Sequence, residues 1–439
     1  MSPLYPYRFE RTASIGDIRD RSAEVEPGAE TGRIEAIAGR IMSIRSHGKV
    51  AFADLRDGSG RIQLFAQVAV LGEDAMQRFV DLGVGDIVGA EGELVMTRRG
   101  ELSVRVSSFT LLAECRRPMP EKWHGVTDVE TRHRQRYLDL LLNAGSRRAL
   151  EARSVANAAI RAFLEERGFI EVETPLLQPI AGGAVARPFV THHNTFDIDL
   201  YLRIAPELYL KRLLIGGFDR VYELNRSFRN EGISSRHNPE FTMLEAYEAY
   251  VDYNDTMSLV EELVRAIAKA VNGSLEVELH QEVIDLAQSF ERVTMFDAIA
   301  RVTGRNLSEA WVAQDRDTLT GSAEDLGVKL DRDWEPGKVV LEIFEATTER
   351  HLVKPTFVAG FPKEVSPLAK DHRSIEGFTE HADLIIGGIE MGAIYSELND
   401  PEEQRRRFEQ QAAARGAGDR EAALPDEDFL EALSYAMPP

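Results

Sequence analysis

The sequence predicts an α+β protein in which a small β-barrel comes first and a larger domain built on an antiparallel sheet follows. Three observations lead to this prediction. Residues 34–113 show short strand patterns separated by turn residues, residues 147–168 have the apolar spacing of a helix, and later strand patterns recur as hairpins between long helical segments. A chain of 439 residues has room for two or three domains at about 150 residues each.

Composition narrows the class of protein. Hydrophobic residues make up 43% and charged residues 28% of the chain, as in ordinary globular proteins. The single cysteine, Cys115, excludes an internal disulfide framework and a cysteine-based zinc site, so we expect a cytoplasmic protein. No signal peptide and no run of about 18 apolar residues is present, so we expect no membrane partner. The net charge of −21 argues against a general nucleic-acid binder but leaves local basic contacts open.

The N-terminal part has the pattern of a five-stranded barrel. We expect a polar extension over residues 1–33, containing loop or a short helix, and the barrel over residues 34–115. Its strands are expected at residues 34–45, 50–57, 60–67, 86–97 and 101–112, with one helix at 72–82. Five strands with one inserted helix indicate a barrel of the OB type, a common oligonucleotide-binding fold.

The rest of the chain changes to α+β character. Residues 116–131, which contain two prolines, are expected to form a linker, and residues 132–439 the second domain. A helix ending near Gly168 is followed by an extended segment at 169–175. Further strands are expected at 200–204, 220–231, 240–250 and 381–398, and helices after Pro206 and near 255–271. Hairpins with helical inserts favour an antiparallel sheet.

The strongest local signal for chemistry is the strand–loop–strand segment 226–247. Its loop contains Arg229, Glu231, Arg236, His237 and Asn238, and arginines in such a loop clamp phosphates through forked hydrogen bonds. The returning strand has a period of two, so Phe241, Glu245 and Tyr247 share one face, where a ring can stack a base and acids can hold a cation. The alternative is a surface hairpin with salt bridges and a half-buried Phe241.

A second hairpin, residues 383–397, suggests a metal site. Gly387-Gly388 is a two-residue turn signal. Pairing Ile386 with Ile389 places Asp383 opposite Gly392 and makes Glu390 the diagonal neighbour of Asp383. Two such carboxylates suit Mg²⁺ that bridges phosphates, whereas the alternative is a pair of solvated acids.

These segments together resemble a known family. Arg229-Asn230-Glu231 with the segment 237–241 resembles motif 2 of the class II aminoacyl-tRNA synthetases, and residues 169–175 resemble the end of motif 1. Residues 182–189, 205–232 and 396–401 closely resemble the lysine-specific branch. The resemblance to the class II lysyl-tRNA synthetases covers nearly the whole chain.

The resemblance implies a fold, a reaction and partners. The domain at 132–439 would be a class II synthetase catalytic domain that activates lysine with ATP and Mg²⁺ and transfers it to tRNA(Lys), and the protein would be a homodimer. It implies catalytic roles for Arg229 and Glu231. ATP-binding positions would be Arg229, Asn230, Glu231, His237, Asn238, Phe241, Glu390 and Met391. Lysine-binding positions would be Gly183, Glu207, Glu245, Tyr247, Ala393, Tyr395 and Glu397. The metal ligands would be Asp383 and Glu390, and the anticodon readers Phe52, Gln63 and Glu101. For Phe52 the alternative is a residue of the barrel core.

One expectation combines the resemblance with strand geometry. Strict alternation along 389–397 puts Ala393, Tyr395 and Glu397 on one face and Glu390 on the other. The family's site needs Glu390 and Glu397 in one cavity, so the strand must slip by one residue between them. We therefore predict a β-bulge near Met391–Gly392, where glycine tolerates the geometry.

The sequence also departs from the family's pattern. Asp383 stands where glutamate is common, which shortens the ligand arm, and Ala393 stands where many members have asparagine. Members continue into a glycine-rich strand and helix, motif 3, whose arginine binds ATP, and this sequence stops at Pro439 before it. We therefore expect weak formation of lysyl-adenylate. Two alternatives stay open, a catalytically impaired relative with a binding or regulatory role and a lysine-activating enzyme that lysylates a protein, although such enzymes typically lack the barrel.

Overall fold

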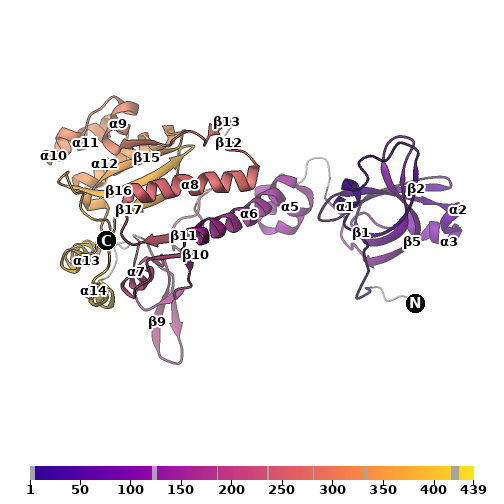
Figure 1. Cartoon of the computed structure of the whole chain (residues 1–439), viewed down its shortest axis with the longest axis horizontal. Coiled ribbons are helices and arrows are strands. Elements are labelled where there is room, and N and C mark those ends of the chain that lie inside the picture. The colour runs from indigo at the N-terminus through magenta and orange to yellow at the C-terminus, as the bar shows by residue number, and fades with distance from the viewer. Residues whose placement is uncertain are drawn as a thin grey trace. The chain divides into compact units, whose positions relative to one another are not determined.

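A computed structural model describes residues 5–120, 126–184, 186–234, 237–279, 281–330, 334–416 and 425–439, apart from the side chains of residues 414–416. The chain divides into two compact units, Met1–Arg148 and Ala149–Pro439, which are described separately (Figure 1). The division falls inside a helix, α6, that spans Ala144–Glu166. The finer division into extension, barrel, linker and second domain stays a prediction.

The first unit contains a closed five-stranded barrel with the strand order β1-β2-β3-β5-β4. Its strands are β1 (Glu30–His47), β2 (Val50–Arg56), β3 (Arg61–Gln67), β4 (Ile87–Met96) and β5 (Leu102–Ala113). The helices that lie wholly within the first unit are α1 (Ile15–Asp20), α2 (Val68–Leu71), α3 (Glu73–Val80), α4 (Val129–Arg134) and α5 (Arg136–Leu142). The predicted barrel and its inserted helix are therefore confirmed, with strand ends that differ by a few residues.

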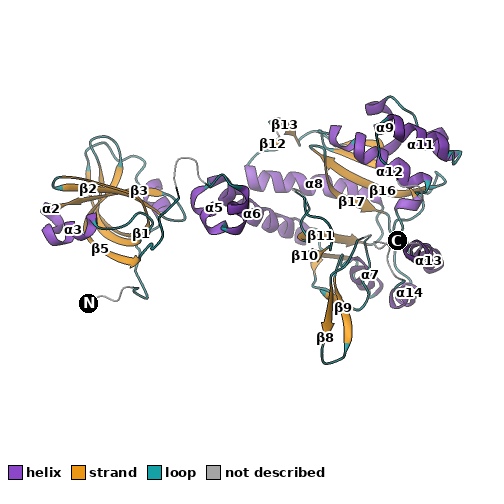
Figure 2. Ribbon diagram, turned by 180° about the vertical axis from the view of Figure 1, so that it is seen from behind, coloured by secondary structure: helices purple, strands orange, loops and turns teal. Residues whose placement is uncertain are grey.

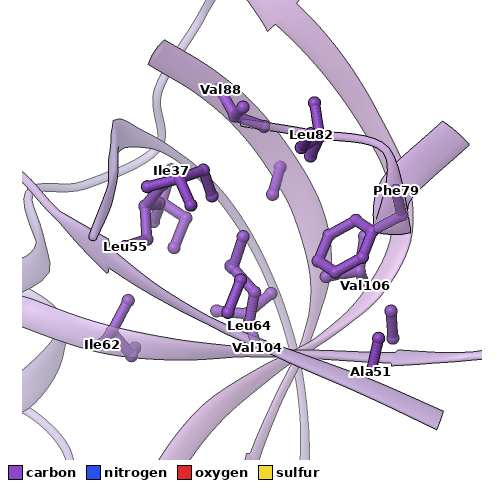
Figure 3. Close-up of a cluster of buried hydrophobic side chains, with 14 of the residues drawn as sticks. Ile37, Ala51, Leu55, Ile62, Leu64, Phe79, Leu82, Val88, Val104 and Val106 are labelled. Atoms are coloured by element: carbon purple, nitrogen blue, oxygen red, sulfur yellow. The ribbon is translucent and has the colours of Figure 1, made fainter. Parts of the chain in front are cut away.

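The barrel is filled by the apolar side chains that alternate along its strands. On β2, Ala51, Ala53 and Leu55 are buried, whereas the residues between them are partly exposed. Phe79 of α3 closes one side of this core, which Figure 3 shows together with Ile37 and the valines of β4 and β5. Because Phe52 belongs to the outer set, the structure does not place it in the barrel core.

The second unit is built on two larger sheets (Figure 2). One has the order β11-β10-β6 and the other the order β14-β15-β16-β17. Their strands are β6 (Ile170–Glu171), β10 (Arg220–Phe228), β11 (Glu240–Glu248), β14 (Glu291–Thr294), β15 (Thr356–Pro362), β16 (Phe378–Ile386) and β17 (Ile389–Tyr395). Smaller sheets contain β7 (Leu177–Gln178), β8 (Val190–His193), β9 (Ile198–Leu202), β12 (Glu276–Leu279) and β13 (Glu282–Asp285).

Antiparallel pairing predominates in the second unit, as predicted, but it is not universal. Strand β6 runs parallel to β10, and β14 runs parallel to β15. Both exceptions are short strands at the edge of a sheet, and they make the sheets mixed. The long hairpins β10–β11 and β16–β17, which carry most of the candidate site, are antiparallel.

Helices cover both faces of the β11-β10-β6 sheet. Apolar residues of α6 and of α8 (Tyr253–Asn272) pack with Tyr222 on one face. On the other face, α7 (Glu207–Ile215) packs with α13 (Pro401–Gly416), α14 (Glu427–Leu433) and Val221. The sidedness follows from the alternation of β10, in which Val221 and Tyr222 point to opposite faces.

The second sheet separates two further cores. Leu384 and Ile394 pack with α8 on one face, and Val358 and Ile385 pack on the other face with helices inserted between β14 and β15. The inserted elements are α9 (Met295–Thr303), α10 (Ser308–Val312), α11 (Arg316–Asp325), α12 (Pro336–Thr347) and the 3-10 helix η1 (Glu349–His351), and η2 (Lys363–Val365) follows β15. None of the helices in the described part of the chain has the length and apolar character needed to cross a bilayer.

Candidate active site

Three glutamates converge at the N-terminus of α7. Glu207 is the first residue of this helix, and Glu245 lies on β11. Glu397 follows β17 and forms an isolated antiparallel β-bridge with Ala369. The regular β10–β11 ladder puts Glu245 and Tyr247 on the face that α7 covers, and the hydroxyl of Tyr247 donates to Glu245 at 3.1 Å. The glutamates predicted to bind lysine therefore come together from three separate parts of the chain.

The same pocket contains Lys211, which the sequence did not single out. Its side chain is fully buried, and its Nζ lies 2.6 Å from Glu207 Oε1 and 2.5 Å from Glu397 Oε2. Burial disfavours its charged form, but the two carboxylates outweigh burial and raise the pKa of Lys211. The ammonium is therefore held charged inside the pocket. Glutamate and lysine four residues apart in a helix were the only sequence signal for this pair.

The negative charge of the glutamates exceeds the positive charge that Lys211 supplies to them. Burial raises the pKa of Glu207 to about 7, although Lys211 opposes the shift. Burial, with the nearby charge of Glu207, raises the pKa of Glu245 to about 8. Burial also raises the pKa of the Tyr247 phenol well above its usual range, so this hydroxyl stays neutral and can donate. A cluster of this kind is costly until cations enter it.

Gly183 lies against the backbone of Glu207. It has a φ of +85°, and a side-chain Cβ at this position would lie 2.9 Å from Glu207 Cβ. Only glycine fits this approach without strain, because the left-handed conformation and the contact both exclude a side chain. The structure therefore brings Gly183 to the pocket that contains Glu207.

The β16–β17 hairpin turns through Gly387-Gly388, both with positive φ, as predicted. Ile386 pairs with Ile389 and Ile385 with Glu390, but the register shifts by one residue beyond them, so that Leu384 pairs with Gly392. The predicted bulge is confirmed and leaves Met391 as the extra residue. The predicted pairing of Asp383 with Gly392 is wrong, because the bulge moves Asp383 opposite Ala393.

The bulge brings the acids of the hairpin to one face. Residues directly opposite share a face, so Glu390, Ala393 and Asp383 point the same way. The charge of Asp383, followed by burial, raises the pKa of Glu390 to about 7, and Arg229 opposes that shift. Tyr395 joins this face, where burial raises the pKa of its phenol. Two acids missed from the sequence, Glu345 and Glu349, also act on Glu390.

A further residue that the sequence analysis missed is His381 on β16. Its Nε2 lies 2.8 Å from Asp383 Oδ1, its Nδ1 lies 2.8 Å from Ser366 Oγ, and its ring stacks on Phe361. These contacts fix the direction of the short Asp383 side chain. A histidine two residues from a candidate ligand on the same strand face was the signal available.

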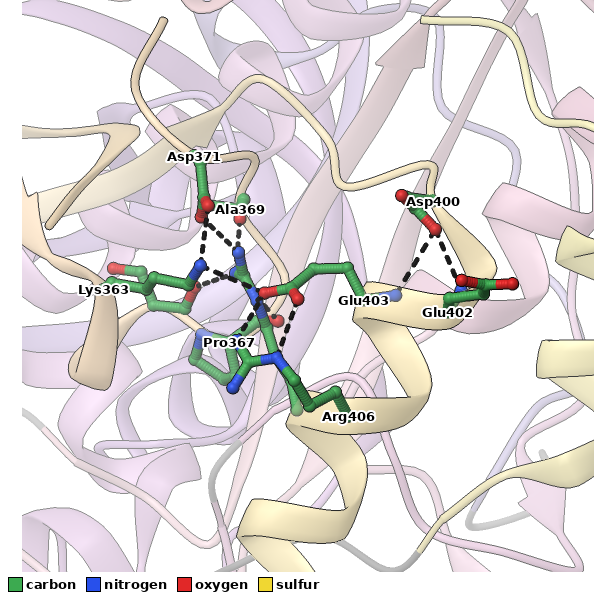
Figure 4. A network of polar contacts seen from close by, with 10 residues as sticks. Lys363, Pro367, Ala369, Asp371, Asp400, Glu402, Glu403 and Arg406 are labelled. Atoms are coloured by element: carbon green, nitrogen blue, oxygen red, sulfur yellow. Dashed lines mark hydrogen bonds and ion pairs between the residues drawn. The ribbon is translucent and has the colours of Figure 1, made fainter. Parts of the chain in front are cut away.

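Hydrogen bonds and ion pairs connect α13 to the segment after β15 that contains Ser366 and Ala369. The buried Arg407 donates to the carbonyls of Ser366 and Ala369 and pairs with Asp371 and Glu403, and Lys363 pairs with the same two acids. Figure 4 shows this network around Ala369 and Asp371. Because Ala369 bridges Glu397, the network supports the position of that glutamate.

The loop of the β10–β11 hairpin carries the predicted nucleotide contacts. The guanidinium of Arg229 lies 5.2 Å from the centre of the Phe241 ring, and its buried Nε has no hydrogen-bond partner among the described residues. Glu231 accepts from the backbone N–H of Arg187, and His237 interacts with Ser234. Asn230, Glu231, His237 and Asn238 are exposed, and Arg236 lies outside the described residues.

These residues fit an anion and a hard cation. A buried donor of Arg229 without a partner is costly unless a phosphate or carboxylate accepts from it. Among the described residues there is no cluster of three acidic, histidine or cysteine ligands. Two carboxylates are nevertheless the donor set that Mg²⁺ uses when phosphates complete its coordination, and Asp383 and Glu390 provide it. Met391, as the bulged residue, is half exposed beside them.

On the barrel, the rings of Phe52 and Phe65 stack with centres 5.0 Å apart, and Arg45 lies over Phe52. Gln63 is covered, and its side-chain oxygen accepts from Ser103. Glu101 is partly exposed and 3.9 Å from Arg61. An outward aromatic pair with an arginine is the type of surface that stacks bases of single-stranded RNA.

Comparisons with known proteins show the family to which the chain belongs. Residues 128–439 match the family of class II tRNA synthetases (D, K and N), and residues 36–112 match the OB-fold nucleic acid binding domain. The class is therefore that of the synthetases for aspartate, lysine and asparagine, preceded by a nucleic-acid-binding barrel.

Individual relatives narrow the class to one amino acid. The chain is 50% identical to a lysine–tRNA ligase of Moorella thermoacetica, over 98% of this chain and 86% of the relative. It is 48% identical to one of Carboxydothermus hydrogenoformans, over 99% of this chain and 88% of the relative. A lysine–tRNA ligase of Xanthomonas oryzae pv. oryzae is 49% identical over 99% of this chain and 86% of the relative. The chain belongs to the lysine–tRNA ligases of the class II synthetase family.

Proposed function

We propose that the residues that come together between α7, β11 and β17 form the lysine and ATP site of a lysine–tRNA ligase. Glu245, Glu397 and Tyr247 would hold the ε-ammonium of lysine, and Glu207 with the Gly183 backbone the α-ammonium. The observation that carries this proposal is the convergence of three carboxylates at the N-terminus of α7, where the pKa values of Glu207 and Glu245 are raised. A pocket of this charge rejects neutral and acidic side chains, because they would leave buried acids unpaired.

Arg229 would bind the anionic end of the substrates. Its buried Nε has no hydrogen-bond partner among the described residues, and the lysine carboxylate and the α-phosphate of ATP would accept from this guanidinium. Phe241 would stack on adenine, with Asn230, Glu231, His237, Asn238 and Met391 around the nucleotide. Mg²⁺ held by Asp383 and Glu390 would neutralise the phosphates.

The reaction needs no protein nucleophile. A carboxylate oxygen of lysine attacks the α-phosphorus of ATP, the bond to the β-phosphate oxygen breaks, and pyrophosphate leaves. A hydroxyl of the terminal tRNA ribose then attacks the acyl carbon, and AMP leaves with the bonding electrons. The residues of this chain act by positioning the reactants and by balancing charge.

The barrel would recognise the anticodon of tRNA(Lys). Phe52 would stack on a base, and Gln63 and Glu101 would read its edges, although Gln63 must exchange its bond with Ser103 for one with RNA. We further propose a cytoplasmic homodimer, in which α6 and the strand up to Pro175 form an interface with two-fold symmetry.

The experiment for this proposal is lysine-dependent exchange of labelled pyrophosphate into ATP. We expect lysine to support exchange, whatever its rate, and aspartate, asparagine and norleucine not to do so. Arg229→Met should remove exchange, whereas Arg226→Met, on the exposed side of the same hairpin, should retain it. Exchange that depends on aspartate or asparagine would contradict the assignment of the pocket.

A further inference from the structure

The acids of the proposed lysine pocket do not balance the one cation that the protein supplies. Glu207 and Glu397 both contact Lys211, and Glu245 lies on the strand beside them. Three carboxylates against one ammonium leave two negative charges unmatched. Free lysine carries two ammonium groups, which is the number that the pocket lacks.

Other charged groups around the pocket do not alter this count. Glu223 lies directly opposite Glu245 in the β10–β11 ladder, but Arg203 pairs with it at 2.6 Å, and both side chains are buried. Tyr247 and Tyr395 stay neutral because burial raises the pKa of each. Asp383 pairs with His381, and the charge of Arg229 acts on Glu390, so neither acid takes a cation from the three glutamates.

We propose that Lys211 is a built-in counter-ion that sets the charge requirement of the pocket at two cations, and thereby selects an amino acid with two ammonium groups. This inference rests on the proposed function of the pocket and adds a specificity-determining residue to it. A contact made only for stability would not need an ammonium shared between two of the binding carboxylates. An apolar residue in the same place would leave three acids to be matched by two cations.

The unmatched charge has a measurable consequence. In the empty pocket the raised pKa values of Glu207, about 7, and of Glu245, about 8, mean that protons supply the missing positive charge. Entry of two ammonium groups lowers both pKa values and expels these protons. At pH 7.5 we expect release of about one proton for each lysine bound. Affinity should therefore rise as pH rises through 7 to 8.

Removal of the Lys211 ammonium should increase the number of protons that the glutamates bind before lysine enters. The positive charge of Lys211 lowers the pKa of both Glu207 and Glu245, so Lys211→Met should raise both and add protons to the empty pocket. Lysine must displace the proton of each glutamate, so each unit by which the pKa rises weakens lysine binding about tenfold at neutral pH. The difference from the wild type should shrink toward pH 8.5. A residue that merely supports the fold would weaken binding equally at every pH.

The test is titration calorimetry of lysine into the whole protein between pH 6.5 and 8.5, in two buffers with different ionisation enthalpies, which counts the protons released. We expect Lys211→Met to release more protons than the wild type, and Lys211→Arg to release the same number. Arg265→Met, which removes a cation bound to Glu261 and the Leu286 carbonyl, serves as the matched control and should match the wild type.

The double variant Lys211→Met with Glu207→Gln keeps the test decisive if the single variant does not fold. It removes one negative and one positive charge, so it leaves two carboxylates for two cations, and its proton release should return toward the wild-type value. Equal proton release in the wild type and Lys211→Met, or no release by the wild type despite binding, would overturn the inference. Failure of the wild type to bind lysine would instead overturn the proposed function.

Discussion

Replacement of Glu245 by glutamine should make the protein more stable in the absence of lysine and should at the same time weaken its binding of lysine. The structure raises the pKa of this carboxyl from 4.5 to about 8, first through burial and then through the charge of Glu207. A carboxyl with a raised folded-state pKa contributes stability that is fully present below the unfolded pKa of 4.5. That contribution is lost progressively as pH rises from 4.5 to about 8, because the unfolded carboxyl ionises in this range whereas the folded one keeps its proton.

The size of the effect follows from the shift. One pKa unit corresponds to about 1.4 kcal/mol. Because Glu245 shares protons with Glu207, the free-energy cost is lower than the whole shift of one group would give. We therefore expect a cost of about 1–3 kcal/mol at pH 8. Glu245→Gln removes this cost and should raise the free energy of unfolding of the empty protein at pH 8, with little change at pH 5. It should also abolish most lysine binding, because a neutral amide replaces a charged acceptor.

Urea unfolding at pH 5 and pH 8, combined with lysine calorimetry, measures both effects. Glu240→Gln, on the same strand but exposed and paired with Arg226, is the matched control and should change stability by less than about 1 kcal/mol at either pH. The reasoning is refuted if Glu245→Gln is less stable than the wild type at pH 8, or if it binds lysine with undiminished affinity.

Three further predictions follow from the other parts of the site. Glu397→Gln should weaken lysine binding by about 1–3 kcal/mol, as for one charge-assisted hydrogen bond, and unchanged affinity in calorimetry would remove Glu397 from the pocket. Phe52→Ala should weaken binding of a lysine-anticodon stem-loop by about 1–3 kcal/mol if its ring stacks a base, with a scrambled loop as the control. Light scattering should give the mass of a dimer, and a monomer at micromolar concentration would count against the proposed interface.

Long periodic elements were predictable from the sequence. The barrel strands alternate apolar and polar residues, and the regular period of β11 correctly placed Glu245 and Tyr247 on one face. The bulge in β17 was predictable because the family resemblance required Glu390 and Glu397 to serve one site from positions that alternation separates. The exact partner of Asp383 was not, since a register shift displaces every pair beyond it.

Short and buried features escaped prediction. Strands of two to four residues, such as β6 and β14, carry too little periodicity to reveal their parallel pairing. Lys211 reads in sequence as an ordinary residue of an amphipathic helix, because a pattern does not show that a helix is covered where it meets Glu397. Likewise, only the fold brings Ser366 to His381 and so fixes the side chain of Asp383.

The most direct test of the central claim is a crystal structure of the protein with bound lysine. The account predicts that the ε-ammonium lies among Glu245, Glu397 and Tyr247, that the α-ammonium lies beside Glu207, and that the carboxylate points toward Arg229. Lys211 should keep its contacts with Glu207 and Glu397. Lysine bound elsewhere, or with its carboxylate toward the three glutamates, would contradict the account.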